Sequence, residues 1–384
     1  MVMLKSAALI FMLFSLLAGS PLRGEELSRY WSVDHYLAAH PEQAALLDAF
    51  ALRVADSPQP LPSATGMAPV RVAIVSPDIQ ASDYWHRSLK AFSGRAKALG
   101  LNLQITVYSA RPGAIDPVAQ VERLREALDS QPDYLVYTLD TPVHHRLAER
   151  LLAISSTHQA GPKIILQNIT TPLRAWDGMQ PWLYVGFDHV EGSRMLARHF
   201  IEHTQGRGEV VMLYAGEGYI SQSRGDTFLY EIAKFPDLAL RATYLTQLQM
   251  EKARRATEDA LIRYPDLTLI YACATDIALG AAAAVTAASR ESTLLINGWG
   301  GGGQELQLLQ QGVLAATVMR MNDDAGVAMA EAIAMDQKGQ GHQVPRLFAG
   351  EMVLLTRDMT PDTIRALEQR AFRYSGLPDP ITLE

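Results

Sequence analysis

Short apolar runs alternate with longer amphipathic segments along most of this chain. Residues 70–75 form the first run, which is rich in β-branched side chains, is closed by Ser76-Pro77 and predicts a buried strand. A stripe at spacings of four and three then predicts a helix, through Trp85, Leu89, Phe92, Ala96 and Leu99. The same pattern predicts further strands near 103–108, 134–138, 163–167, 183–187, 209–214, 240–245, 268–273, 294–297 and 315–319.

Strands that alternate with helices indicate βαβ units, so we predict an α/β fold with parallel sheets covered on both faces. Ten strands are many for one open sheet, and 384 residues is the length of a two-domain protein. We therefore predict two lobes, with chain crossings in residues 167–183, 300–303 and 339–345. This gives a helical lead-in at 25–68, a first lobe from 69–170 and 300–345, and a second lobe from 171–299 and 346–384.

The first 24 residues have the order of a secretory signal peptide. Lys5 precedes an apolar run at 7–18, and Gly19-Ser20-Pro21 follows it. The run is shorter than a membrane-spanning helix requires, although the pattern leaves a membrane anchor or a buried helix open as alternatives. Ser20 stands where a lipoprotein signal would place a cysteine. We therefore expect a cleaved signal peptide at 1–24, no lipid anchor and a secreted, soluble protein.

The net charge bears on the class of partner, and the cysteine content bears on how the fold is stabilised. The net charge of -7 argues against nucleic acid, which needs clustered Lys and Arg. Cys273 is the single cysteine, so no internal disulfide can form, and its place in an apolar run favours a small buried side chain over a reactive nucleophile. Stability must then come from a large core.

Sequence motifs of enzymes are few. The chain has no G-x-S-x-G, Walker or H-E-x-x-H motif, and the adjacent His144-His145 pair is expected on the solvated surface rather than at a metal. Residues 298–303 match the dinucleotide pattern G-x-G-x-x-G. The match lies near the end of the chain, and Trp299 occupies the position that a pyrophosphate would approach. We expect no enzyme activity, no cofactor and no metal.

Polar and aromatic residues follow the predicted strands, where open parallel sheets bind ligands. These candidate ligand-binding residues are Gln80, Ser82, Trp85, Asn168, Arg224, Thr275, Asp276, Trp299 and Arg320. Amides and hydroxyls can bond the OH groups of a small polyol, and indole faces can cover its C–H groups. The two arginines add fixed positive charge and planar donor forks, which a neutral sugar does not need.

Each candidate residue also has a structural alternative. Ser82 and Thr275 precede helices and could be N-caps, and Asp276 could complement a helix dipole. Trp85 belongs to the apolar stripe of its helix and could serve packing alone. The two arginines have aspartates nearby, Asp226 for the first and Asp323-Asp324 for the second, and could form surface ion pairs.

Several blocks of the chain resemble the LuxP-type family of autoinducer-2 receptors, which are type I periplasmic binding proteins related to ribose-binding proteins. The resemblance runs from about Tyr30 to Ser375, and many of its blocks are six or seven residues long. They are Ser82–Trp85, Leu166–Pro172, Leu183–His189, Glu217–Ser221, Arg224–Phe228, Ile296–Gly302, Val318–Asp324 and Arg370–Ser375. Gly303, which extends the glycine run, and Ala274, before the Thr-Asp pair, depart from the family pattern.

The resemblance implies two Rossmann-like lobes joined by a three-strand hinge, in a protein of the periplasm. It implies that the nine candidate residues bind autoinducer-2 as its cyclic borate diester, an anion that the two arginines would face. Borate would be part of the ligand, with no other cofactor. The implied partner is the periplasmic domain of a LuxQ-type membrane sensor histidine kinase. A pentose-type sugar-binding component of an ABC importer is the alternative, and the arginine pair argues against it, because a neutral sugar compensates desolvated guanidiniums poorly.

Overall fold

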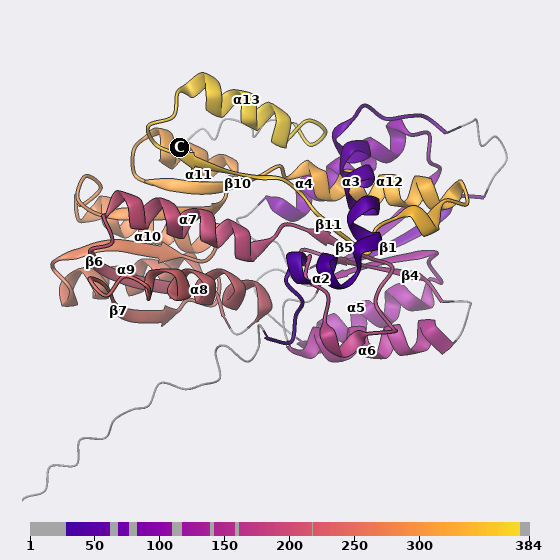
Figure 1. Ribbon diagram of the computed structural model, residues 1–384, viewed down its shortest axis with the longest axis horizontal. Coiled ribbons are helices and arrows are strands. Elements are labelled where there is room, and N and C mark those ends of the chain that lie inside the picture. The colour runs from indigo at the N-terminus through magenta and orange to yellow at the C-terminus, as the bar shows by residue number, and fades with distance from the viewer. Residues whose placement is uncertain are drawn as a thin grey trace, which may run out of the picture.

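The computed structural model describes residues 28–376 except 62–67, 77–82, 110–116, 139–141, 158–160 and 217. The chain folds into two lobes, each built on a six-stranded sheet (Figure 1). The first sheet has the order β11-β5-β4-β3-β1-β2, and all of its pairs are parallel. Its strands are β1 (Val70–Ser76), β2 (Leu103–Ser109), β3 (Tyr134–Thr138), β4 (Lys163–Gln167), β5 (Leu183–Gly186) and β11 (Leu347–Ala349).

The second sheet has the order β12-β10-β9-β8-β6-β7, in which only β12 is antiparallel, to its neighbour β10. The strands are β6 (Gly208–Tyr214), β7 (Leu238–Leu245), β8 (Leu267–Ala272), β9 (Leu295–Gly300), β10 (Ala316–Arg320) and β12 (Met352–Thr356). Two α/β lobes with mainly parallel sheets confirm the predicted fold class.

Helices pack on both sheets. Those of the first lobe are α2 (Val33–Ala39), α3 (Pro41–Ala55), α4 (Tyr84–Ala98), α5 (Pro117–Asp129), α6 (Pro142–Thr157) and α12 (Asp323–Gln337). Those of the second lobe are α7 (His189–His203), α8 (Tyr219–Ile232), α9 (Met250–Arg263), α10 (Thr275–Ala287), α11 (Gly303–Gln310) and α13 (Pro361–Ala371). Two short 3-10 turns are η1 (Arg174–Trp176) and η2 (Gly341–Gln343).

The strand sequences explain the layered core of the first lobe. Successive side chains of a strand point to opposite faces, so a continuous apolar run supplies both faces of a sheet. In β1, Val72 and Ile74 belong to one buried cluster, whereas Ala73 and Val75 belong to another on the opposite face. The buried strands thus carry helices on both sides, as the uninterrupted apolar run predicts.

The chain crosses between the lobes in three places, but the predicted positions and lobe boundaries need correction. The crossing expected in residues 167–183 is wrong, because β4 and β5 pair in the same sheet with Ile165 opposite Leu183. The intervening loop instead covers the first lobe, where Trp176 is buried. The crossings follow β5, β10 and β11. Those expected in 300–303 and 339–345 are also wrong, because β9 and β10 pair in one sheet and α12 and β11 both belong to the first lobe. β5 and β11 therefore belong to the first lobe, while β10 and α11 belong to the second, contrary to the predicted ranges.

The chain ends contribute to the first lobe as well. Phe50 and Val54 of α3 pack into its core, and the segment after α13 returns to it, where the backbone N–H groups of Tyr374 and Ser375 donate to Asp323. The predicted signal peptide at 1–24 lies outside the described residues. Within the described part of the chain, no helix has the length and apolar character needed to cross a membrane.

Two single-residue expectations are tested by the core. Cys273 is buried as expected, and burial raises the pKa of its thiol. The expected solvated position of His145 is wrong, because its ring is half-buried and bonds the Tyr30 hydroxyl at 2.9 Å. Burial lowers the pKa of His145 to about 4.

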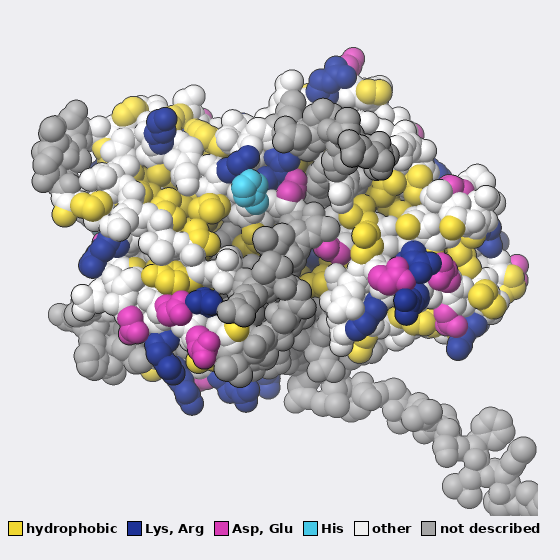
Figure 2. All heavy atoms as spheres, turned by 180° about the vertical axis from the view of Figure 1, so that it is seen from behind, with side chains coloured by type: hydrophobic (Ala, Val, Ile, Leu, Met, Phe, Trp, Pro, Cys, Tyr) yellow, Lys and Arg dark blue, Asp and Glu magenta, His cyan; other side chains and the backbone are white. Residues whose placement is uncertain are grey.

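On the face in Figure 2, the described Lys and Arg side chains are interspersed with Asp and Glu and form no single basic field.

Candidate functional site

Arg320 lies where the two lobes meet. It ends β10 of the second lobe, and its guanidinium carbon sits 4.4 Å from the ring centroid of Tyr84 and 5.8 Å from that of Phe187, both of the first lobe. The side chain is 6% exposed. No residue in the described ranges accepts a hydrogen bond from Arg320 or forms an ion pair with it, and its buried Nε has no hydrogen-bond partner. Burial lowers the pKa of Arg320, because removal from water disfavours the charged form.

Glycine at position 300 makes room for this guanidinium. Gly300 has φ +130°, and a Cβ built there would lie 2.6 Å from Nη2 of Arg320. A side chain is therefore excluded twice, by the backbone conformation and by the arginine. The glycine run thus brings the backbone after β9 close to Arg320.

Arg224 of α8 supplies the second buried guanidinium. Its Nη1 donates to the Cys273 carbonyl at 2.8 Å, and its guanidinium carbon stacks 3.7 Å from the Trp299 ring centroid. Desolvation lowers the pKa of Arg224, and repulsion from Arg320 lowers it further. Arg224 lies over Trp299 and Arg320 lies against the next residue, Gly300, so the two cations are near one another.

The predicted surface ion pairs of these arginines are absent from the described residues. Asp324 pairs instead with Arg370 and Arg373, at 2.8 and 2.6 Å, and Asp226 accepts from Tyr214. No described carboxylate lies within ion-pair distance of Arg224 or Arg320. The buried Glu305 carboxylate partly offsets the lowering of the pKa of both arginines but lies beyond ion-pair distance, and two buried guanidiniums without a direct ion pair are costly unless an anion joins them.

His189 links the second arginine to the first lobe. Its Nε2 lies 3.1 Å from the Asn168 carbonyl, and its Nδ1 lies 3.4 Å from both Nε and Nη2 of Arg224. Because Arg224 can only donate, Nδ1 must be the acceptor and Nε2 must carry the proton. Complete burial and Arg224 lower the pKa of His189, which keeps the ring neutral.

Asn168 follows β4, as predicted, with the left-handed backbone conformation φ 66°. It is 7% exposed, and its side-chain Oδ1 is buried without a hydrogen-bond partner among the described residues. An unpaired buried amide oxygen is costly, so this atom is an acceptor available to a ligand hydroxyl.

Trp299 is fully buried and held from several sides. Its backbone N–H donates to Oε1 of Glu305 at 2.9 Å, and its indole Nε1 donates to the Tyr271 hydroxyl at 3.2 Å. Oε2 of Glu305 accepts from Gly301 and Thr317. The buried carboxylate thereby fixes the loop that carries the indole, and both of its oxygens are occupied.

Thr275 and Asp276 begin α10 beside that loop. Ala274 is the N-cap, so the alternative of an N-cap role for Thr275 is wrong. The Thr275 hydroxyl donates to the Trp299 carbonyl at 3.0 Å, and Asp276 is 8% exposed in the first helical turn. Thr275 therefore contacts the Trp299 backbone, and Asp276 follows it on the same helix.

Three predicted residues remain, of which the structure describes Trp85. The Trp85 ring lies half-buried against the core of the first lobe and meets Tyr84 edge-on at 5.0 Å. It thus supports the aromatic ring beneath Arg320. Gln80 and Ser82 lie outside the described residues.

The prediction missed Tyr84, Phe187, His189 and Glu305. The rule that ligands bind beyond strand ends, applied to β5, would have selected Phe187 and His189. Tyr84 lies next to the predicted residue Trp85 but outside the apolar stripe of that helix, so the pattern did not select it. Nothing in the sequence pattern around Glu305 sets it apart from a solvated helical glutamate.

Comparison with known proteins agrees with this architecture. A family model described as a periplasmic binding protein domain matches residues 72–341, about seven tenths of the chain. A solute-binding protein of an ABC transporter from Agrobacterium vitis, bound with α-D-tagatopyranose, has 20% identity and a TM-score of 0.66 over 78% of this chain and 98% of its own.

Two further solved structures are similar. A glucose-galactose binding protein from Geobacillus stearothermophilus has 19% identity and a TM-score of 0.65 over 77% of this chain and 100% of its own. The fructose-binding periplasmic domain of a hybrid two-component system has 19% identity and a TM-score of 0.64 over 80% and 95%. Proteins of this family bind solutes and are not enzymes, and the family implies a periplasmic location. The chain belongs to the periplasmic binding protein family and has its type I fold.

Proposed function

We propose that this protein is a periplasmic receptor that binds autoinducer-2, as its furanosyl borate diester, between the two lobes. The observation that carries the proposal is the buried guanidinium of Arg320, whose Nε has no hydrogen-bond partner, beside that of Arg224. A ligand that joins them must bring negative charge, because a buried guanidinium is poorly compensated by neutral groups.

The surrounding side chains suit the rest of such a ligand. Asn168 offers an unpaired carbonyl oxygen to a furanose hydroxyl, and the 8% exposed Asp276 lies in the first turn of α10. The tetrahedral borate would face the arginines. A cyclic borate diester carries its full negative charge on a small group, whereas a carboxylated or phosphorylated sugar would place its charge on a longer arm.

A sugar-carrier role in an ABC importer is the second candidate. It is favoured by the similar structures that hold sugars, such as those described with α-D-tagatopyranose and with myo-inositol. Their identity of 20% or less supports a common fold rather than a common ligand. In this candidate the arginine pair would contact only neutral hydroxyl groups.

Signalling to a LuxQ-type membrane sensor histidine kinase is part of the proposal. Closure of two hinged lobes on a ligand changes the surface that a partner contacts, which gives a periplasmic kinase domain something to detect. The similar periplasmic domain of a hybrid two-component system supports the idea that this fold can serve a kinase.

The test is calorimetric titration of the purified protein with autoinducer-2, once with borate and once with boron rigorously excluded. Tight binding that requires borate is expected. A neutral pentose panel, titrated in the same buffers, tests the carrier role. Equal affinity for autoinducer-2 with and without borate would overturn the assignment, and tight borate-independent binding of a pentose would favour the carrier.

A further inference from the structure

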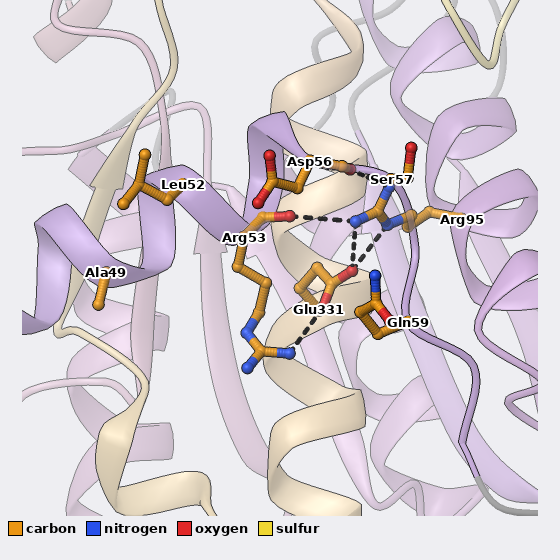
Figure 3. Close-up of a pocket in the computed structure, with 8 residues that line it drawn as sticks. All are labelled: Ala49, Leu52, Arg53, Asp56, Ser57, Gln59, Arg95 and Glu331. Atoms are coloured by element: carbon orange, nitrogen blue, oxygen red, sulfur yellow. Dashed lines mark hydrogen bonds and ion pairs between the residues drawn. The ribbon is translucent and has the colours of Figure 1, made fainter.

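A cavity of about 250 Å³ opens in the first lobe, away from the residues that surround the two arginines (Figure 3). It lies where α3 packs against α4 and α12. The part contributed by α3 and the residues after it precedes the segment that matches the family model. The cavity is lined by Ala49, Leu52, Arg53, Asp56, Ser57, Gln59, Arg95 and Glu331.

Arg95 forms the rigid floor of the cavity. This 1% exposed residue donates to the backbone carbonyls of Arg53 and Asp56 at 3.0 and 2.8 Å, and so satisfies the carbonyls at the end of α3. It also donates to the Tyr374 hydroxyl at 2.8 Å and to Glu331. Its donors are thus committed to the protein, and it has little left for a ligand.

Glu331 is bonded on one side only. Its Oε1 contacts two nitrogens of Arg95, with Nε at 2.7 Å and Nη2 at 2.6 Å. Its Oε2 is buried with no hydrogen bond and has only a long ion pair with Nη1 of Arg53, at 3.7 Å. The Glu331 side chain is 1% exposed. A buried carboxylate oxygen that accepts nothing is costly, so this atom calls for a donor from within the cavity.

The remaining walls offer charge of both signs and an apolar patch. Arg53, 37% exposed, has Glu331 as its one side-chain partner in the described part of the chain, and the exposed Asp56 carboxylate lies one helical turn on. Leu52 is 67% exposed, which is high for a leucine, and borders the cavity with Ala49. Two arginines and two acids balance, so the site as a whole favours neither a net cation nor a net anion.

We propose that this cavity is a second binding site, for a small zwitterion of amino-acid type. The ligand ammonium would donate to Oε2 of Glu331, its carboxylate would meet Arg53, and an apolar side chain would cover Leu52. An ammonium suits the site better than a hydroxyl, because hydrogen bonds between charged groups are roughly twice as strong as neutral ones. The volume is below the roughly 300–1,000 Å³ of sites for drug-sized ligands, which limits the ligand to a small molecule.

The test uses the full-length mature protein and the standard L-amino acids, screened by thermal shift and then titrated by calorimetry. At least one is expected to bind with a stoichiometry near one. Arg53→Gln is expected to weaken it about tenfold or more, the loss of one charge-assisted bond. Asp56→Asn is expected to weaken it less, because Asp56 attracts the ligand ammonium without bonding it. Arg123→Gln, in an exposed pair with Glu126 of α5, is the matched control and should bind as the wild type does.

A second arm replaces the best amino acid by its N-trimethyl betaine, which keeps the charges but has no N–H donor. The betaine is expected to bind at least tenfold more weakly. The proposal is overturned if no amino acid binds, if the betaine binds equally well, or if both cavity variants bind as the wild type does. The last result would place the amino acid elsewhere, for instance between the lobes. Because Arg53 and Asp56 are partly or fully exposed, their variants should fold normally, which circular dichroism verifies.

Discussion

Replacing Arg320 by methionine should weaken ligand binding and stabilise the empty protein. Arg320 is 6% exposed and has no described hydrogen-bond or ion-pair partner, so only the rings of Tyr84 and Phe187 and the more distant Glu305 and Asp83 offset its removal from water. Replacing this poorly compensated buried charge by an apolar side chain of similar length should raise the unfolding free energy by about 1 kcal/mol or more. Loss of a charge-assisted bond of roughly 1.5–3 kcal/mol should weaken binding of the borate diester about ten- to a hundredfold.

Thermal unfolding without ligand and calorimetric titration with autoinducer-2 plus borate measure the two effects. Arg320→Met is expected to raise Tm by about 2 °C or more while its Kd increases. Arg320→Lys should recover only part of the affinity, because lysine lacks the planar fork. The exposed Arg357, just after β12 and opposite the start of β10, is the control, and Arg357→Met should change neither quantity. A lower Tm together with an unchanged Kd for Arg320→Met would refute the reasoning.

Three further outcomes are expected. Closure of the hinge should reduce the radius of gyration measured by small-angle scattering when autoinducer-2 and borate are added, and an identical profile at saturation would count against closure. Gly192→Ala would put its Cβ 2.9 Å from the Trp299 ring and 3.2 Å from the sulfur of Met352, so urea denaturation should show a loss of about 1–3 kcal/mol, with weaker ligand binding because the indole shifts off Arg224. If the variant is as stable as the wild type, the packing argument fails. Nicotinamide cofactors should not bind, because the Gly301 N–H already donates to Glu305 and Arg320 packs against Gly300. Saturable micromolar binding of a nicotinamide cofactor would contradict this.

Local pattern determined most of the fold that could be predicted. Buried parallel strands are continuous apolar runs, and each of the ten predicted runs coincides with a strand of the two sheets. Two strands were not predicted: β11, which at three residues is too short to show periodicity, and the five-residue apolar strand β12. Sheet membership depends on pairing between distant segments, and the proline-rich loop before β5 has the composition of either a crossing or a surface cover. The lobe boundaries were misplaced for that reason.

The sequence likewise predicted several residues of the candidate site but not the contacts between them. The strand-end rule selected Asn168, Arg224 and Arg320, which the structure brings close to the meeting of the lobes. It could not show that Arg320 would lack a counter-ion, because Asp323-Asp324 is adjacent in sequence but faces Arg370 and Arg373 of the C-terminal segment. It also could not identify Glu305, whose role depends on three donors that converge only in the fold.

The most direct test of the central claim is to identify the ligand that the protein retains. The protein, purified from cells that make autoinducer-2 in borate-containing medium, would be crystallised and its boron content measured. We expect about one boron per chain and tetrahedral density between the lobes, in contact with the guanidiniums of Arg224 and Arg320. Density for a sugar without boron, or an arginine pair that contacts no ligand in the closed form, would contradict the account.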